Sequence, residues 1–301
     1  MTKKSGDTLS IVIPFFNDEE LVRPLYERLK EVFGDDEKYE FILIDDGSSD
    51  RTFEGLKSLC KEDHRFRAVR LNRNWGQRKA ITEGMKIMRG KLAATMDPDL
   101  QNDPEVILKL AGLMTFGTEM VSGYRVKRNE SLIRRRLPSF ITNRLLALAS
   151  GVRMKDFGCP MAVFRTGLVR ETIQQSPSRL FSKTLAAMLA GSVRETPISH
   201  IPRQRGKSSY TFMRLVKMFH FRFFSALELR LIRAGLSPEI IKAGLIWALM
   251  VNGLFVAASL MVVPYFAILF LCTFFIFAAF AQSVRKNDRR RRDPDPVAEI
   301  V

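Results

Sequence analysis

The chain has 301 residues, of which 46% are hydrophobic, so it can form one large domain or two smaller ones with a sizeable core. Its formal net charge of +16 indicates an anionic partner, such as nucleic acid, anionic lipid or a phosphorylated substrate. Its three cysteines lie far apart and form no Cys-x-x-Cys pair, which argues against a zinc site and against a disulfide framework.

The first hundred residues alternate between predicted strands and predicted helices. Short apolar runs predict strands at 9–16, 39–44, 66–71 and 92–96. Apolar residues at helical spacing predict a helix after the first strand, capped by Asn17, and two more at about 52–60 and 77–89. This alternation predicts a mostly parallel α/β sheet with helices on both of its faces.

Polar clusters follow the first, second and fourth predicted strands, beginning at Asn17, Asp45 and Asp97. Because the carboxyl ends of parallel strands share one edge of the sheet, these clusters predict a composite ligand site there. Asp97 and Asp99 are hard oxygen ligands that can share one divalent cation and leave positions open for phosphate oxygens. No G-x-G-x-x-G or Walker A loop is present, so carboxylates and a metal would hold a nucleotide.

Two basic stretches follow the predicted sheet. The first runs from Ser122 to Arg136, and a solvated loop would also explain its composition. Between Arg203 and Arg233 there are eight Lys or Arg and one acid, interleaved with apolar residues. This pattern predicts amphipathic membrane-interface helices at 209–238, the alternative being helices packed on the soluble domain.

An uncharged run extends from Ala243 to Val284. A continuous helix of that length would span about 63 Å, whereas the hydrocarbon core is about 30 Å thick. We therefore predict, for the segment 239–284, two transmembrane helices at about 243–262 and 265–284, with Pro264 in the turn. Basic flanks place both ends in the cytoplasm, together with the domain 1–208, and 285–301 is predicted to be a basic disordered tail. A soluble helical core is the alternative.

Six motifs occur in the order found in one enzyme family. They are Ile13-Pro14-Phe15-Phe16-Asn17, Ile44-Asp45-Asp46-Gly47-Ser48-Ser49-Asp50, Arg73-Asn74-Trp75-Gly76-Gln77, Met96-Asp97-Pro98-Asp99-Leu100-Gln101, the segment from Gly123-Tyr124-Arg125 to Arg135-Arg136-Leu137-Pro138-Ser139 with Asn143, and Arg203-Gln204-Arg205-Gly206-Lys207-Ser208. On these motifs the chain resembles the family 2 inverting glycosyltransferases with a nucleotide-sugar-binding (GT-A-like) fold. Within them it is similar to the polyprenyl-phosphate glycosyltransferases, such as dolichol-phosphate mannose synthases and bactoprenol glucosyltransferases.

The resemblance implies transfer of a sugar from a UDP- or GDP-linked donor to an undecaprenyl or dolichyl phosphate at the plasma or inner membrane, for cell-envelope glycan synthesis. It implies catalytic roles for Asp97, Asp99, Arg125 and Arg203, and Mg²⁺ or Mn²⁺ on Asp97, Asp99 and Gln101. It places the nucleotide sugar at Pro14, Asn17, Asp18, Asp45, Asp46, Asn74, Gln77 and Asp97. It places the acceptor phosphate at Arg125, Arg135, Arg136, Arg203 and Ser208.

The chain departs from the family pattern at three positions. Asp18 stands where Glu is usual, Pro98 where Ala is usual, and Ser209 where the late motif usually has Lys. The last departure leaves open which cation meets the acceptor phosphate. A membrane glycosyltransferase that extends a polysaccharide or glycolipid is the alternative enzyme, although the Gln/Arg-x-x-Arg-Trp motif of such synthases is absent. A basic membrane- or nucleic-acid-binding protein would explain the charge but not the carboxylates, so we expect no nucleic acid partner. The motifs do not distinguish which sugar is transferred or whether the protein forms a homo-oligomer.

Overall fold

The computed structural model describes residues 8–125, 137–176, 178–198, 223, 226–233, 235 and 297–300. The chain divides into two compact units, one comprising residues 1–144, 152–207 and 295–301, the other 145–151 and 208–294. In the second unit, residues 226–233 are helical, and Nη1 of Arg230 donates a hydrogen bond to the carbonyl of Leu148 at 2.6 Å. The first unit contains the sheet and every predicted site residue that the structure describes.

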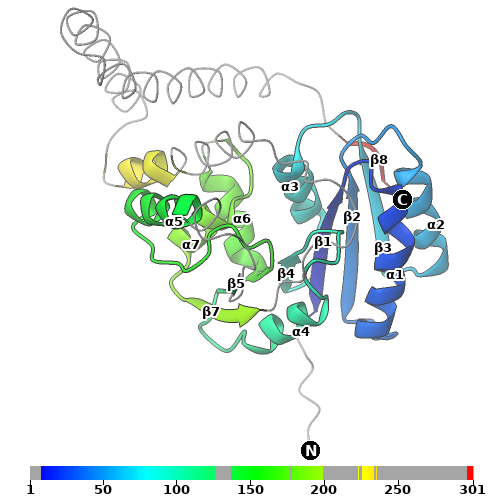
Figure 1. The fold of residues 1–301 in the computed structure, drawn as a ribbon, viewed down its shortest axis with the longest axis horizontal. Helices are drawn as coiled ribbons and strands as arrows, with labels where there is room; N and C mark the ends of the chain where they lie inside the picture. Colours follow the sequence, from blue (N-terminus) through cyan, green and yellow to red (C-terminus); the bar gives the residue numbers. More distant parts are fainter. Residues whose placement is uncertain are drawn as a thin grey trace, which may run out of the picture. The chain divides into compact units, whose positions relative to one another are not determined.

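The first unit is built on one eight-stranded sheet in the order β7-β5-β6-β4-β1-β2-β3-β8 (Figure 1). The strands are β1 (Leu9–Phe15), β2 (Tyr39–Asp45), β3 (Phe66–Leu71), β4 (Leu92–Thr95), β5 (Met120–Arg125), β6 (Ala162–Arg165), β7 (Val193–Ile198) and β8 (Val297–Ile300). As predicted, β1 to β4 are parallel. Strand β6 runs antiparallel to β4 and β5, and β8 antiparallel to β3, so the sheet is mixed, but the other six of its eight strands run in one direction, as predicted for a mostly parallel sheet.

Helices cover both faces of this sheet, as predicted. The buried residues of α1 (Glu19–Phe33), α2 (Thr52–Glu62) and α4 (Glu105–Gly112) form one core with Ile11, Ile13, Phe41 and Phe66 on one face. On the other face, α3 (Gln77–Ile87) lies so close that a Cβ on Gly84 would meet Val12 at 2.4 Å. Helix α6 (Thr166–Gln175) packs against α3 and β6, and α7 (Lys183–Leu189) packs against α6. Helix α5 (Leu137–Ser150) follows β5.

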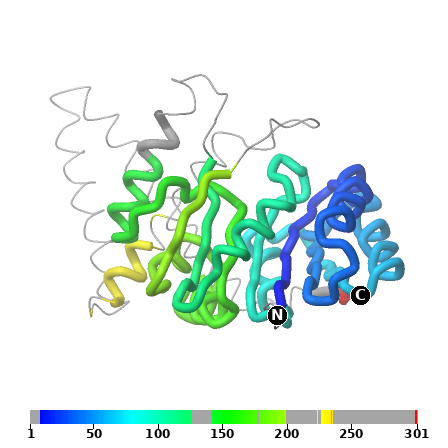
Figure 2. Tube along the Cα trace, turned by 90° about the horizontal axis from the view of Figure 1, so that it is seen from below, coloured from blue at the N-terminus to red at the C-terminus, as the bar shows by residue number. Residues whose placement is uncertain are grey.

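The end of the chain returns to the sheet. Residues 297–300 pair with β3, with Arg70 opposite Glu299, and Lys57 of α2 contacts the Glu299 carboxylate at 2.6 Å. In Figures 1 and 2 this short red strand lies against the blue, N-terminal half of the chain. The prediction of disorder for 285–301 is therefore wrong for these four residues. The predicted spans 243–262 and 265–284 lie outside the described residues, and no described helix is long and apolar enough to cross a membrane.

A buried ion pair at the end of α2 gives the first unit a pH-dependent stability. Burial alone would raise the pKa of Asp63, but hydrogen bonds and the charge of Arg65 lower it from 3.8 to about 2. Because the pKa is lower in the folded state, this stability is complete above the unfolded pKa and is lost as pH falls from about 4 to about 2. The loss is about 2 kcal/mol. Thermal unfolding midpoints measured across this range should fall less steeply for Asp63→Asn than for the wild type, and equal slopes would contradict the assignment.

Candidate functional site

The loops after β1 and β2 are joined by Asn17. Its backbone N–H donates to Oγ of Ser48, and its Oδ1 accepts the N–H of Ser49, both at 2.9 Å. Asn17 has a φ of 53°, a left-handed conformation that asparagine tolerates better than most residues. It therefore lies outside α1, and Asp18 occupies the N-cap position without a side-chain cap hydrogen bond. The prediction that Asn17 caps this helix was wrong because its amide joins two loops instead.

Asp46 anchors the loop that follows β3. Its Oδ1 accepts the N–H of Trp75 at 2.7 Å, and its Oδ2 accepts the N–H of Gly76 at 2.8 Å. The next residue, Gly47, has a φ of 71°, and a Cβ there would lie 2.4 Å from the backbone of Arg73. Only glycine fits this approach, so Asp46 and Gly47 together fix the path of residues 73–76.

Replacing Asp46 with asparagine should loosen this loop. The asparagine side chain has one acceptor oxygen, so it cannot accept both N–H groups, and its amide N–H₂ would face one of them. An unsatisfied buried donor costs about 1–3 kcal/mol. Hydrogen exchange at Trp75 and Gly76 should accelerate. Asp36→Asn is the matched control, because the Asp36 carboxylate also accepts a backbone N–H, from Lys38 at 3.1 Å, but on the exposed surface. Unchanged protection at Trp75 in Asp46→Asn would contradict this role.

Asp45, at the end of β2, is fully buried and incompletely satisfied. Its Oδ1 accepts the N–H of Ser48 at 3.1 Å. Its Oδ2 has no hydrogen-bond donor among the described residues, and Nε of Arg70 lies 3.4 Å away as an ion-pair partner. Burial raises the pKa of the Asp45 carboxyl, whereas the Ser48 hydrogen bonds and the charge of Arg70 oppose that rise. A buried carboxylate oxygen without a donor is suited to accept a hydrogen bond from a ligand.

Asp97 and Asp99 follow the end of β4. Oδ1 of Asp97 accepts a hydrogen bond from Nε2 of Gln77, the first residue of α3, at 2.7 Å. Oδ1 of Asp99 accepts the N–H of Gln101 at 3.2 Å, in a turn where Leu100 has a φ of 52°. Both carboxylates are partly exposed. Within the described ranges, no group of three or more His, Cys, Asp or Glu could hold a metal. Two carboxylates still fit a divalent cation whose other ligands are phosphate oxygens or water.

A second cluster surrounds Arg125 at the end of β5. Its guanidinium contacts the Asp156 carboxylate through two hydrogen bonds, Nε to Oδ2 at 2.7 Å and Nη2 to Oδ1 at 3.0 Å. Nζ of Lys183 donates to Oγ of Ser122 and to the carbonyls of Asp156 and Cys159 at 2.7–3.2 Å. Sequence reasoning missed Asp156 and Lys183. Asp156 lies in the loop before β6, two residues ahead of Gly158, which is a weak signal, and Lys183 has none.

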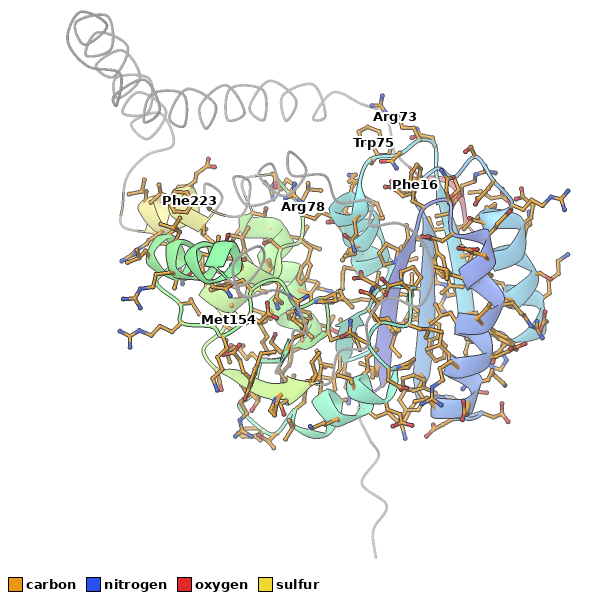
Figure 3. All side chains as sticks on the ribbon, viewed as in Figure 1. Phe16, Arg73, Trp75, Arg78, Met154 and Phe223 are labelled. Atoms are coloured by element: carbon orange, nitrogen blue, oxygen red, sulfur yellow. The ribbon has the colours of Figure 1, made fainter. Side chains whose placement is uncertain are left out.

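The sheet brings most of the described candidates to one edge. In the parallel register Phe15 lies opposite Asp45 and Val12 opposite Thr95, so the residues after β1, β2 and β4 meet at the carboxyl-end edge. Strand β5 runs in the direction of β4, since β6 is antiparallel to both, and Arg125 ends at the same edge. Figure 3 shows Phe16, Arg73 and Trp75 at this end, and the Arg73 guanidinium lies 4.0 Å from the Trp75 ring centroid.

The remaining candidates are placed differently or not described. Pro14 is buried inside β1, opposite Ile44, and Asn74 is exposed in the loop after β3. Asn143 of α5 accepts the N–H of Phe157 at 3.4 Å and so contacts the segment that carries Asp156. Several predicted acceptor-side residues lie outside the described residues: Arg135, Arg136, Arg203 and Ser208.

Relatives of known name match most of the sheet unit. An undecaprenyl-phosphate 4-deoxy-4-formamido-L-arabinose transferase of Photorhabdus laumondii is 36% identical over 214 residues, 70% of this chain and 66% of the relative. A dodecaprenyl-phosphate galacturonate synthase of Rhizobium johnstonii is 33% identical over 231 residues, 74% of this chain and 68% of the relative. The match thus spans about two thirds of the length of these relatives.

Solved structures show the same fold at low sequence identity. Glucosyl-3-phosphoglycerate synthase of Mycobacterium tuberculosis, in complex with Mn²⁺ and UDP-glucose, has a TM-score of 0.54 at 16% identity and covers 78% of this chain and 81% of its own. A mannosyltransferase of Pyrobaculum calidifontis, in complex with GDP-Man and Mn²⁺, has a TM-score of 0.52 at 14% identity, and the match covers 93% of this chain and 88% of the mannosyltransferase. Both confirm the predicted GT-A-like α/β fold.

The family itself follows from the sequence of the sheet unit. The model of glycosyl transferase family 2 matches residues 10–173, which include β1 to β6 and the ends of the strands that carry Asp45, Asp97 and Arg125. That range is more than half of the chain. The chain belongs to glycosyl transferase family 2.

Proposed function

We propose that this protein is a membrane-anchored inverting glycosyltransferase that moves a sugar from a UDP- or GDP-linked donor to a polyprenyl phosphate. The observation that carries the proposal is the meeting of Asp45, Asp97 and Asp99 with Arg125 at one edge of the sheet. The named relatives, which act on undecaprenyl and dodecaprenyl phosphates, support the acceptor class. The product would supply the synthesis of cell-envelope glycans.

Asp45 and Asp46 take different parts in donor binding. Asp45 has a buried oxygen without a described donor, so we assign it to the base and ribose of the nucleotide. Asp46 uses both oxygens to hold the loop of Trp75 and Gly76, so we assign it to positioning that loop. The sequence alone left the choice between these neighbours open.

Asp97 and Asp99 would hold Mg²⁺ or Mn²⁺ together with the donor diphosphate. A bound divalent cation acts as a Lewis acid and stabilises the charge that grows on the leaving diphosphate. Gln77 orients Asp97 through its hydrogen bond, and the short turn at Leu100 keeps Asp99 near the end of β4. The complexes of the two solved glycosyltransferases with Mn²⁺ and a nucleotide sugar support a metal of this kind.

The acceptor needs cations more than it needs a base. A phosphate monoester has a second pKa of about 6, so a lipid phosphate is largely ionised at pH 7 and can attack the anomeric carbon directly. Its oxygen forms the new bond, the bond to the diphosphate breaks, and the configuration inverts. Arg125 lies at this edge of the sheet, where Asp156 holds its guanidinium by two hydrogen bonds, and we assign this guanidinium to the acceptor anion, which it would bind by charge-assisted hydrogen bonds. Arg203 and Arg135 or Arg136, outside the described residues, complete the proposed set.

Both ends of the chain would lie on the cytoplasmic side. Strand β8 supports this topology, because its pairing with β3 requires residues 297–300 to lie on the same side of the membrane as the sheet. The uncharged run Ala243–Val284 then has to cross the membrane an even number of times. Two crossings match its length, with Pro264 on the far side.

Cysteine labelling tests this topology. In a background without the three native cysteines, Tyr265→Cys should react with an impermeant reagent in intact cells, and Asn287→Cys should react only after the cells are opened. The expected difference is nearly all-or-none because the reagent cannot enter the cytoplasm. Labelling of both positions only in opened cells would exclude a hairpin that fully crosses.

The function is tested with the purified full-length chain, undecaprenyl phosphate and a panel of UDP- and GDP-linked sugars. Mass spectrometry of the lipid fraction should find one sugar attached through a phosphodiester, and undecaprenol without phosphate should give no product. Equal glycosylation of undecaprenol, or of a soluble sugar, would overturn the proposal.

A further inference from the structure

Arg70, near the end of β3, contacts both sides of the Asp45 loop. It lies opposite Asp45 in the parallel register, and its Nε is 3.4 Å from Oδ2 of that carboxylate. Its Nη2 donates to the carbonyl of Ser48 at 3.2 Å. Its guanidinium also lies 5.1 Å from the ring centroid of Phe53, a buried residue of α2. Arg70 is therefore held between the sheet, the helix and the loop that carries the donor-binding carboxylate.

The C-terminal strand covers the outer side of β3 at this position. Glu299 is the partner of Arg70 in the antiparallel register, and its carboxylate contacts Lys57 of α2 at 2.6 Å. Lys57 also lies 5.9 Å from the centroid of the Phe53 ring that Arg70 contacts. Without β8, strand β3 would be the edge of the sheet, with backbone groups of Val69 to Leu71 exposed to water.

We infer that Arg70 is a positioning residue that holds Asp45 for the donor nucleotide, and that the C-terminal strand β8 keeps Arg70 in place. The inference rests on the proposed function, because it takes Asp45 as a nucleotide ligand. It extends that function by making donor binding depend on the last residues of the chain, which follow the segment assigned to the membrane.

The physical reason lies in the burial of Asp45. A buried carboxylate is stable as an anion only if a positive charge or hydrogen bonds compensate for its lost solvation. Ser48 supplies a hydrogen bond to one oxygen, and among the described residues Arg70 supplies the nearby positive charge that faces the other. The charge of Arg70 opposes the rise that burial causes in the pKa of the Asp45 carboxyl. Loss of Arg70 would thus favour protonation or movement of the Asp45 carboxylate, which has to be ionised to bind the nucleotide.

Two variants of β3 separate positioning from general stability. Arg70→Gln should weaken the binding of UDP or GDP to the full-length protein about tenfold or more, measured by calorimetry in detergent with Mg²⁺. Arg70→Lys should recover part of the affinity, because it keeps the charge but cannot also reach the carbonyl of Ser48. Arg67→Gln is the matched control. Arg67 lies on the same strand and pairs with Glu40 at 2.8 Å, but it bonds the carbonyl of Ile87 on the other face, so nucleotide affinity should be unchanged.

Steady-state kinetics give a second readout. Arg70→Gln should raise the KM for the donor and leave the KM for undecaprenyl phosphate and the kcat at saturating donor within about twofold, because only donor binding is weakened. A parallel fall of all three parameters would indicate a structural role and overturn the inference. Equal weakening of nucleotide binding in Arg67→Gln would do the same.

Deletion of residues 297–301 tests the part played by β8. Hydrogen exchange at Val69 to Leu71 should accelerate, and nucleotide affinity should fall, although less than in Arg70→Gln. Accelerated exchange with unchanged affinity would overturn the role of β8 and leave that of Arg70. If the wild-type protein binds neither UDP nor GDP, the proposed function fails. If the wild type binds one of them and Arg70→Gln binds it equally well, only the inference fails.

Discussion

Replacing Asp99 with alanine is expected to abolish sugar transfer almost completely and to leave the fold intact. The side chain is partly exposed after the end of β4, and its described hydrogen bond, to the N–H of Gln101, lies within a surface turn. Its removal therefore disturbs little packing. If Asp99 holds the metal, its loss removes several kcal/mol of charge stabilisation from the transition state. A decrease in kcat/KM of about a thousandfold follows, since each 1.36 kcal/mol is tenfold in rate.

Asp103→Ala is the matched control for this experiment. Asp103 lies four residues further along the same segment, and its carboxylate contacts Arg28 of α1 at 2.8 Å instead of facing the site. Transfer by this variant should stay within about twofold of the wild type, because a partly exposed ion pair is worth about 1 kcal/mol or less. Excess chelator should abolish wild-type transfer, and added Mg²⁺ or Mn²⁺ should restore it. Full activity in chelator, or in Asp99→Ala, would contradict the metal role.

The first half of the fold could be predicted because its elements have strong local patterns. Strands β1 to β4 are short apolar runs that end in turn residues, and α1 repeats buried residues at helical spacing. Their order also fixes a parallel arrangement, and with it the shared edge that holds Asp45 and Asp97. The candidate site on the donor side was thus accessible from the sequence.

The rest depends on contacts between distant residues, which no local pattern shows. The hydrophobic periodicity does not indicate that β6 pairs antiparallel with β4. Nor does it indicate that β8 pairs with β3, a strand more than two hundred residues earlier in the chain. Which of the two neighbours, Asp45 or Asp46, is left to bind a ligand depends on which carboxylate accepts the backbone N–H of Trp75, and that carboxylate is Asp46. Asp156 became a candidate only when its carboxylate was found on Arg125.

Replacing Arg125 with alanine should reduce transfer about a hundredfold and leave donor binding intact. A charge-assisted contact that holds one anion against another is worth several kcal/mol in the transition state. Arg125→Lys should recover only part of the rate, because lysine keeps the charge but cannot form the two parallel hydrogen bonds. The assay is kcat/KM for undecaprenyl phosphate together with UDP or GDP affinity. Unaltered kinetics, or loss of nucleotide affinity, would contradict a role at the acceptor.

The pair with Asp156 makes a double-mutant cycle necessary. Arg125 makes two hydrogen bonds to a buried carboxylate, so its removal also leaves that negative charge without its partner near the expected position of the phosphate. If Arg125 only neutralises Asp156, then Arg125→Ala should cost almost nothing when Asp156→Asn is already present. If Arg125 binds the lipid phosphate, most of the hundredfold decrease should persist in that background, because the alanine variant cannot donate hydrogen bonds to the substrate. We expect the second result, since a guanidinium carries five N–H donors and can therefore bind a carboxylate and a phosphate oxygen at the same time.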